Sequence, residues 1–478
     1  MVPLWVGGGA VLAVPTYLAF RTGGHSTVFG SQTQLVVAIG AFSLLALAVV
    51  TAPWPPVAPG HAALALAALV AFEAWTLLSI AWSPLPSAAA DDGGRAAMYA
   101  AVFGLALVTT RCRHVRAAAP WALLAGVVVV AVYALLSRFA PGLVPTRTLP
   151  LAGERLAHPL TYWNALGLLM VTGVVLAIAL AGAPARSRAA RAAACAAVVP
   201  CGVALALTLS RGALVALAVG LIALGLARPR PASGLAAVLG LAAAGAAAGL
   251  AFALPAVRTL EESRSAQESQ GLVAAAATVV LAVAAGLAFA ALLRRVDGPA
   301  PRLSRRLRLA VVAGLVAVIA AGGILSFRYV ERTENVPSTA SRITTLESNR
   351  PAYWGVALDA FADHPLAGVG SSGFNVEWRR ERDEPQNALD AHSLYIETLA
   401  ELGLVGFLLL AAFVAVVAAG VMRRLRDDPD DPLPPMAVAA LAALAFHAGL
   451  DWDWEMPAAT LPALILAAAA LQRRAATL

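Results

Sequence analysis

The feature that most constrains this chain is its series of apolar runs, each about as long as a membrane-spanning helix. Of 478 residues, 60% are hydrophobic and 13% are charged, whereas soluble domains contain roughly 45–50% apolar residues. A hydrocarbon core about 30 Å thick needs roughly 20 apolar residues per helix. Because helices satisfy their own backbone polar groups in lipid, the sequence predicts an all-α polytopic membrane protein with about fourteen (12–14) transmembrane helices. The predicted spans lie near residues 2–20, 35–52, 61–82, 96–110, 118–139, 161–183, 190–209, 211–227, 232–255, 271–293, 308–327, 394–422, 432–450 and 457–472.

The positions of the arginines predict the orientation. The sequence contains no lysine, so all 34 basic residues are arginines. Nineteen of them, with only five acids, fall in segments 111–117, 184–191, 228–231, 294–308, 423–431 and 473–474. Short cytoplasmic loops carry the excess of positive charge, and these segments all fall on one side when spans are counted from a cytoplasmic N-terminus. Both termini are therefore expected in the cytoplasm, and the protein is expected in the cytoplasmic (inner) membrane.

The same arginine loops argue against a nucleic-acid partner. Nucleic-acid binding requires a basic domain or a basic stripe, and the sequence has neither. Loops beside a membrane need no partner other than anionic lipid. The three cysteines have no metal-ligand spacing, so no zinc site is predicted.

The chain divides into three predicted parts. Residues 1–327 hold helices 1–11, residues 328–393 form one long extracytoplasmic loop, and residues 394–478 hold helices 12–14. The loop is expected to contain an amphipathic helix that starts at Arg350, since Pro351 suits a first helical turn. Its apolar residues recur at helical spacing, and they are Trp354, Ala357, Leu358 and Phe361. In its simplest role this helix caps the bundle.

Three arginines outside the cytoplasmic loops need another explanation, because charge near a bilayer is costly and often functional. Arg211 stands in a tight turn between two apolar segments, where it either contacts a ligand or extends to the interface as long basic side chains do at helix ends. Arg155 precedes a helix whose start carries Tyr162 and Trp163, residues that are also typical of an interfacial aromatic belt. Arg350 opens the amphipathic helix.

The outer loop contains the segment HPLAGVGSSGF, in which Gly368, Gly370 and Gly373 fit a G-x-G-x-x-G pattern. A dinucleotide site is excluded because no β-strand precedes the glycines and no βαβ unit is possible. Two interpretations stay open. The glycines form either a turn whose backbone N–H groups face a phosphate or a plain loop.

His392 is the candidate general base. It sits at the mouth of a predicted helix, with Glu397 and Glu401 following before the chain becomes continuously apolar. A lone histidine is more often structural, but this one is expected to face a wet cleft at a helix mouth, in a protein with unexplained outer arginines. The segment 451–455, DWDWE, forms a short outer turn that either shapes a sugar site or serves as an interfacial anchor.

The order of these motifs resembles the O-antigen ligase and Wzy-type polysaccharide polymerase superfamily of membrane glycosyltransferases. The resemblance rests on AWSPLPSAAA after an early helix, the stretch from Arg155 to Asn164, SRG at 210–212, and RPAYW...HPLAGVGSSGF...AHSLYIETLAELGLVG at 350–406. It implies a GT-C-like fold and transfer of a polyprenyl-diphosphate-linked glycan to a glycan, lipid or protein acceptor on the outer face, without metal, nucleotide sugar or other cofactor. Ligase, polymerase and protein O-glycosyltransferase share these motifs, so the subgroup stays open.

The resemblance also implies residue roles. Arg211 and Arg350 would bind the diphosphate, with Arg155 as a further contact, and His392 would be the catalytic residue that activates the acceptor hydroxyl. Guanidinium forks match phosphate oxygens well in a low dielectric. The chain departs from the family in two features, Ser393 in place of the usual asparagine after the histidine and a helix count above twelve.

A transporter or flippase is the alternative function. That class predicts repeated halves with interrupted helices and ionisable residues near the bilayer midplane. The sequence shows no clear internal repeat, and Glu73 is the only acid deep in a predicted span.

Overall fold

The computed structural model describes residues 2–25, 28–51, 57, 60–184, 186–259, 263–296, 306, 349–382 and 387–472. Every regular element among them is helical. The elements are α1 (Val2–Ala19), η1 (Thr22–Gly24), α2 (Val28–Thr51), α3 (His61–Leu78), η2 (Ser79–Ala81), α4 (Pro86–Thr109), α5 (Arg113–Phe139), η3 (Pro150–Ala152), α6 (Trp163–Ala181), α7 (Arg188–Leu207), α8 (Arg211–Ala227), α9 (Pro231–Ala253), α10 (Pro255–Arg258), α11 (Arg264–Val296), α13 (Arg350–Asp363), α14 (Phe374–Glu381), α15 (Leu394–Asp427), α16 (Leu433–Ala448) and α17 (Pro457–Leu471).

Eight helices of the described residues are long and apolar enough to cross a membrane, and four shorter helices are also apolar. The prediction of an all-α protein with many apolar helices is thus confirmed. The predicted span 308–327 and the first part of the predicted outer loop, 328–348, lie outside the described residues.

The helix boundaries differ most from the prediction at α4. The apolar run suggested a start near residue 96, but α4 begins at Pro86 and includes the charged turn before that run. Asp92 and Arg95 form an ion pair of 2.8 Å within this turn. Because the two charges compensate each other, the polar turn continues the helix into the bundle.

Two helices form the centre of the bundle. All fifteen residues of α17 are buried, and α6 is buried along its length apart from Trp163. The helix α17 packs against α1, α4 and α16, whereas α6 packs against α5, α7, α8 and α16. Many residues of α17 are alanine, and small side chains let neighbouring helix backbones approach closely.

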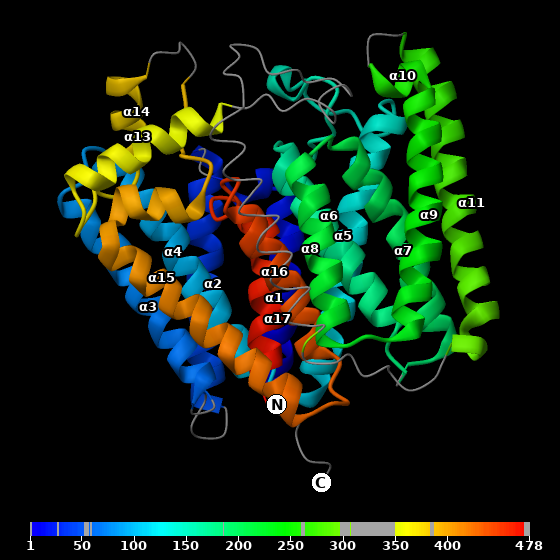
Figure 1. The fold of residues 1–478 in the computed structure, drawn as a ribbon, viewed down its shortest axis with the longest axis horizontal. Helices are drawn as coiled ribbons and strands as arrows, with labels where there is room; N and C mark the ends of the chain where they lie inside the picture. The colour runs from blue at the N-terminus through cyan, green and yellow to red at the C-terminus, as the bar shows by residue number, and fades with distance from the viewer. Residues whose placement is uncertain are drawn as a thin grey trace.

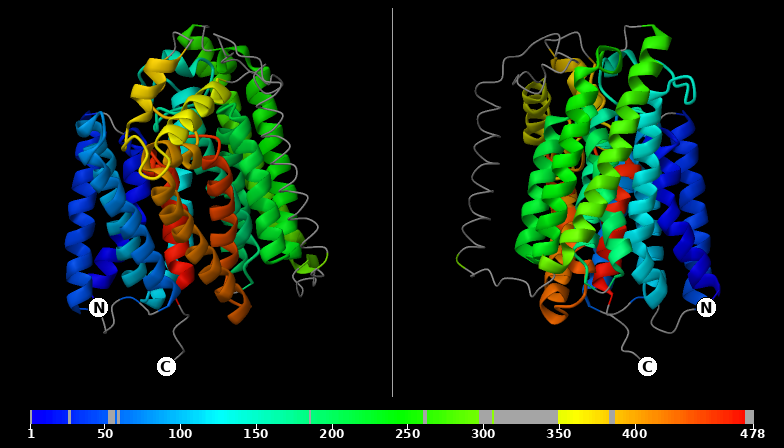
Figure 2. Two further views of the ribbon diagram at one scale, coloured as in Figure 1. Left: turned by 60° about the vertical axis from the view of Figure 1, so that its left-hand side comes forward. Right: turned by 90° about the vertical axis from the view of Figure 1, so that its right-hand side faces the viewer.

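One end of the bundle is covered by α13 and α14 (Figure 1). The start of α1 and the end of α17 lie at the opposite end (Figures 1 and 2).

The predicted helix that starts at Arg350 is confirmed as α13, but the prediction of which of its residues are buried is partly wrong. Tyr353 and Ala360 are buried beside Trp354 and Ala357, while Leu358 is 39% exposed. The face is rotated because Tyr353 packs edge-on against Trp378 of α14, at 4.8 Å between ring centroids.

The helix α15 bends at Gly403, and Figure 1 shows its two segments meeting at an angle. Gly403 has φ +65° inside the helix, a left-handed conformation that glycine adopts at little cost. A Cβ built on Gly403 would overlap the carbonyl group of Leu366. The bend therefore depends on a glycine at this position, and it lets the chain around residue 366 pass close to the helix.

We expect Gly403→Ala to destabilise the protein by more than ~1 kcal/mol, since a non-glycine residue in this conformation costs about that much before any clash. The matched control is Gly245→Ala in α9, where a Cβ would meet nothing within 4 Å and where alanine favours a helix by up to ~1 kcal/mol. Thermal unfolding of both variants in detergent is the measurement. Equal melting temperatures for the two variants would contradict this account of the bend.

Candidate active site

The candidate site is organised around Asp451, in the loop between α16 and α17. Its side chain is 1% exposed. The carboxylate accepts hydrogen bonds from the Tyr162 hydroxyl at 2.6 Å, the Asn164 amide at 2.6 Å and an Arg350 guanidinium nitrogen at 2.5 Å. The backbone N–H of Trp452 donates a further bond of 3.1 Å. One carboxylate thus joins the start of α6, the start of α13 and its own loop.

His392 lies just before α15, as the sequence predicted. Its ring faces Tyr353 at 5.2 Å and meets Trp452 edge-on at 6.2 Å between centroids. The Nδ1 atom lies 3.0 Å from the backbone carbonyl of Asp390. A carbonyl can only accept, so Nδ1 carries the hydrogen and Nε2 is left as a base.

Electrostatics favour the neutral form of this histidine. Burial lowers the pKa of His392 below its ordinary value, and Arg350 adds to this effect, while Asp451 opposes it. Burial alone would raise the pKa of Asp451, but nearby positive charge, that of Arg350 above all, outweighs it and holds that pKa below its ordinary value. The site therefore pairs an ionised carboxylate with a neutral imidazole, which is the form that a general base requires.

A second histidine, which the sequence analysis missed, belongs to the same end of the bundle. His447 Nδ1 lies 2.6 Å from the Asp453 carboxylate, and the two side chains are 1% and 0% exposed. The only sequence signal is a histidine at the end of an apolar run, six residues before an aspartate. In a helical membrane protein that pattern is indistinguishable from ordinary packing.

Arg211 is the first residue of α8, where Ser210 caps the helix by accepting a 3.3 Å bond from Ala213 N–H. The tight turn predicted there is confirmed, because α7 ends at Leu207. The neighbouring Gly212 lies against the His447 ring. The start of α8 therefore meets the part of the structure that carries His447 and Asp451.

The Arg155 side chain contacts residues of its own loop and the start of α6. Its guanidinium lies 3.6 Å from the centroid of the Trp163 ring, and it donates to the carbonyls of Ala152 at 2.9 Å and Leu151 at 2.6 Å. Burial lowers the pKa of Arg155 to about 10, opposed by Tyr162. These contacts hold the loop before α6 in place, and the role of Arg155 at a diphosphate stays a prediction.

The glycine loop is a plain loop. The backbone N–H groups of all seven residues from Gly368 to Phe374 donate to other groups of the protein. Two of their acceptors are the Glu401 carboxylate oxygens, at 2.9 Å from Ser372 N and 3.1 Å from Phe374 N. The interpretation of this loop as a phosphate cradle is therefore wrong in this conformation, because its donors are already occupied.

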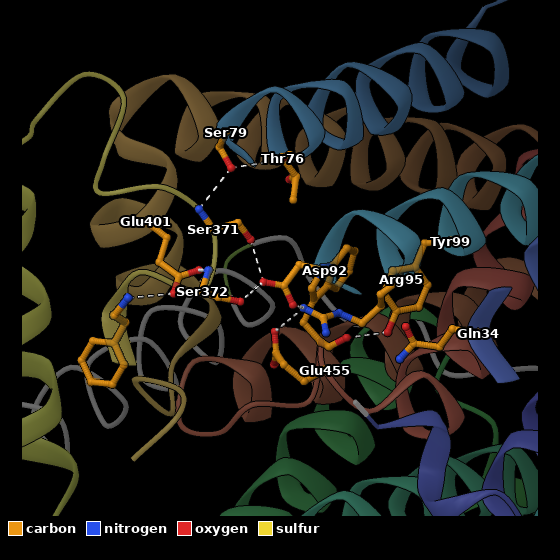
Figure 3. A network of polar contacts seen from close by, with 12 residues as sticks. Gln34, Thr76, Ser79, Asp92, Arg95, Tyr99, Ser371, Ser372, Glu401 and Glu455 are labelled. Atoms are coloured by element: carbon orange, nitrogen blue, oxygen red, sulfur yellow. Dashed lines mark hydrogen bonds and ion pairs between the residues drawn. The ribbon is translucent and has the colours of Figure 1, made fainter. Parts of the chain in front are cut away.

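A polar network beneath this loop ties it to the bundle (Figure 3). Asp92 accepts from the hydroxyls of Ser371 at 2.7 Å and Ser372 at 2.6 Å, and it pairs with Arg95, which also reaches Glu455 at 3.5 Å. Glu73, Glu397 and Glu401 join Asp92, Arg95 and Glu455 around a small cavity of about 40 Å³. The network connects α3, α4, α15 and the loop before α17.

The segment 451–455 is not an interfacial anchor. Four of its five side chains are buried, with Asp453 at 0% and Trp454 at 8% exposure. The Tyr99 hydroxyl donates to the Trp454 carbonyl at 2.6 Å. This turn is instead packed inside the protein at the candidate site. The interpretation of the turn as a sugar site stays a prediction.

Protonation of Glu455 makes stability depend on pH. Burial raises the pKa of Glu455 to about 7 from an ordinary value of 4.5. A carboxyl whose folded-state pKa is raised contributes stability that is present below the unfolded value and is lost as pH rises through the folded value. We expect the wild-type melting temperature to fall between pH 5 and pH 8, and Glu455→Gln to reduce that fall.

The control for this measurement is Glu268→Gln, which changes a carboxyl that is 48% exposed on α11. Thermal unfolding of the three proteins at several pH values gives the comparison. An identical pH dependence in wild type and Glu455→Gln would contradict the assignment.

A large apolar cavity lies beside the same loop. It has a volume of about 270 Å³ and is lined by residues of α15, α16 and α17 together with Trp454. Its lining runs from Tyr395 and Ala448, next to the loop of Asp451, to Val421 and Met422 near the far end of α15. The cavity is therefore an elongated apolar space that ends beside the polar site.

Comparison with known proteins places this site in context. A family model for O-antigen ligase matches residues 269–411, a segment that contains Arg350, the glycine loop and His392. No curated protein matches the chain. Together with the apolar helices, the match supports a multi-pass membrane protein of O-antigen ligase or polymerase type in general. Residues 269–411 are thus similar to an O-antigen ligase domain, which supports the predicted resemblance to the O-antigen ligase and Wzy-type polymerase superfamily.

Proposed function

We propose that this protein is a glycosyltransferase that moves a polyprenyl-diphosphate-linked glycan to an acceptor hydroxyl on the outer face of the cytoplasmic membrane. The observation that carries the proposal is the meeting of Arg350, His392 and Asp451 at one end of the bundle. That end is opposite the start of α1 and the end of α17. With cytoplasmic termini, the site faces the outside.

The donor diphosphate is bound by Arg350 and Arg211. Asp451 fixes the Arg350 guanidinium through one nitrogen, and the side chain is 22% exposed, so a ligand can reach it. Arg211 adds a second guanidinium at the start of α8, where the helix dipole also favours an anion. Two guanidinium groups suit a diphosphate because each can bind phosphate oxygens through a fork of N–H groups.

The acceptor hydroxyl is activated by His392. Its neutral Nε2 takes the hydroxyl proton while the acceptor oxygen attacks the anomeric carbon of the donor sugar. The bond between that carbon and the diphosphate oxygen breaks, and polyprenyl diphosphate leaves. A single displacement of this kind inverts the anomeric configuration.

The apolar cavity supports a lipid-linked donor. A polyprenyl chain needs an apolar surface, whereas its diphosphate needs a polar one. The cavity along α15, α16 and α17 offers the apolar surface, and it ends beside the loop of Asp451, which belongs to the polar site. A free sugar nucleotide would have no use for such a cavity.

A transporter or flippase is the second candidate, and Glu73 is the observation that favours it. This glutamate is 3% exposed in α3, and neither carboxyl oxygen has a hydrogen-bond partner within the part of the chain that the structure describes. Ionisable residues inside a membrane often mark ion pathways. One such residue is weaker support than the site around Asp451.

We expect His392→Ala to lower glycan transfer by roughly 10²–10⁴-fold, the usual contribution of a general base, while the protein still folds and reaches the membrane. The test is mass analysis of polyprenyl-linked glycans from cells that lack the protein or express wild type, His392→Ala or His364→Ala. His364, an exposed histidine after α13, is the control, and its variant should behave as wild type.

The glycans that accumulate also identify the subgroup. Single repeat units would indicate a polymerase, and long lipid-linked chains would indicate a ligase. Unchanged lipid-linked glycans in all four strains would refute the glycosyltransferase proposal and favour the transporter.

The second prediction concerns the arginines. Lysine keeps the charge but cannot reproduce the guanidinium fork, so Arg350→Lys and Arg211→Lys should each reduce transfer by roughly 10–100-fold, the equivalent of one charge-assisted hydrogen bond. Arg264→Lys on α11, where the side chain is 66% exposed, is the control. Transfer rates of the purified proteins at saturating acceptor decide the matter, and a fully active Arg350→Lys would exclude a bidentate contact there.

A further inference from the structure

His447 and Asp453 form a buried pair to which the mechanism above gives no role. The Asp453 carboxylate lies 2.6 Å from His447 Nδ1, and a carboxylate that accepts a bond from Nδ1–H fixes the orientation of the ring. The second ring nitrogen, Nε2, is then directed away from Asp453. Its surroundings decide what the pair can do.

The Nε2 atom faces the first turn of α8. A Cβ built on Gly212 would lie 3.2 Å from Nε2 and 3.3 Å from Cδ2 of His447. Gly212 directly follows Arg211, so the imidazole lies against the turn that carries this arginine. A larger residue at position 212 would stand between the imidazole and this turn, which explains why a glycine follows Arg211.

The charged groups around His447 come from three elements. Asp453 and Asp451 lie in the loop after α16, and Arg350 lies on α13; all three act on His447 electrostatically. The fourth, Arg211, comes from α8 as the neighbour of Gly212. His447 thus lies against the turn that begins with Arg211 and within electrostatic reach of Arg350.

We propose that His447 is a second catalytic residue, which donates its Nε2 proton to the departing diphosphate of the donor, and that Asp453 is its positioning residue. This inference rests on the proposed function. It extends that function by assigning the leaving-group side of the reaction, whereas His392 serves the acceptor side.

The proton balance of the reaction is then complete. The acceptor oxygen forms its bond to the anomeric carbon and loses its proton to His392 Nε2. The electron pair of the breaking carbon–oxygen bond goes to the diphosphate oxygen, which takes the proton of His447 Nε2–H. His392 leaves the step protonated and His447 leaves it neutral, and each returns to its starting state by exchanging one proton with water.

The experiment compares wild type with His447→Ala, His447→Gln, Asp453→Asn and the control His364→Ala, all as full-length protein in detergent with a lipid-linked glycan donor. We expect His447→Ala to lower kcat by roughly 10²–10³-fold with little change in KM. The wild-type rate should fall at alkaline pH as the donating histidine loses its proton. This alkaline limb should be absent in His447→Ala and His447→Gln, and Asp453→Asn should shift it.

A purely structural role would affect stability or KM but would not remove one limb of the pH profile. The proposal is overturned if His447→Gln keeps the wild-type kcat. It is also overturned if His447→Gln loses activity but its rate still falls at alkaline pH as that of wild type does. Since glutamine keeps most of the side-chain volume, it serves where alanine fails to fold. Failure of the proposed function would look different, because wild type itself would then transfer no glycan.

Discussion

The buried carboxylate of Asp451 is the interaction on which the site depends. A buried charge is tolerated only when it is paired and hydrogen-bonded, and Asp451 achieves this with Tyr162, Asn164, Arg350 and the N–H of Trp452. Tyr162, Asn164 and Arg350 are each about 100 or more residues away from Asp451 in the chain. The requirement to satisfy one carboxylate therefore brings α6, α13 and the loop before α17 together, and it sets the position of Arg350 relative to His392.

His392 is held by a second set of restraints on the other side of the site. Glu397 accepts a 2.7 Å bond from Ala391 N–H, directly before the histidine, and Glu401 one turn further on holds the glycine loop. The bend at Gly403 separates this short polar segment from the apolar remainder of α15. The loop that carries His392 is thus held by polar contacts, whereas the rest of α15 packs in the apolar bundle.

The sequence predicted most of the fold but only part of the site, for physical reasons. Apolar runs of membrane length identify helices reliably, because lipid imposes one solution on the backbone. The sequence also located Arg211, Arg350 and His392 through their unusual positions. The start of α4 and the buried face of α13 were not predicted correctly, because they depend on contacts with Glu455 and Trp378 in other elements. The glycine pattern was misleading for the same reason, since Glu401 and Ser79 occupy its N–H groups. The segment that holds Asp453 was singled out, but His447 could not be found, because only the folded chain brings this histidine against Gly212.

The proposed function would account for the location of the site, because a lipid-linked donor requires two kinds of surface. Its diphosphate needs cations held in a low-dielectric setting, where guanidinium contacts are strongest, and its tail needs an apolar surface. Both meet at the loop between α16 and α17, since Asp451 and Asp453 face the arginine and histidine side while Trp454 lines the apolar cavity. The loop serves both surfaces because Asp451, Trp452 and Asp453 contact residues of the polar site, whereas Trp454 lines the cavity. The two aspartates hold Arg350 and His447 in place, and Trp454 holds the same loop against the cavity, so this one loop fixes the polar site next to the end of the apolar space.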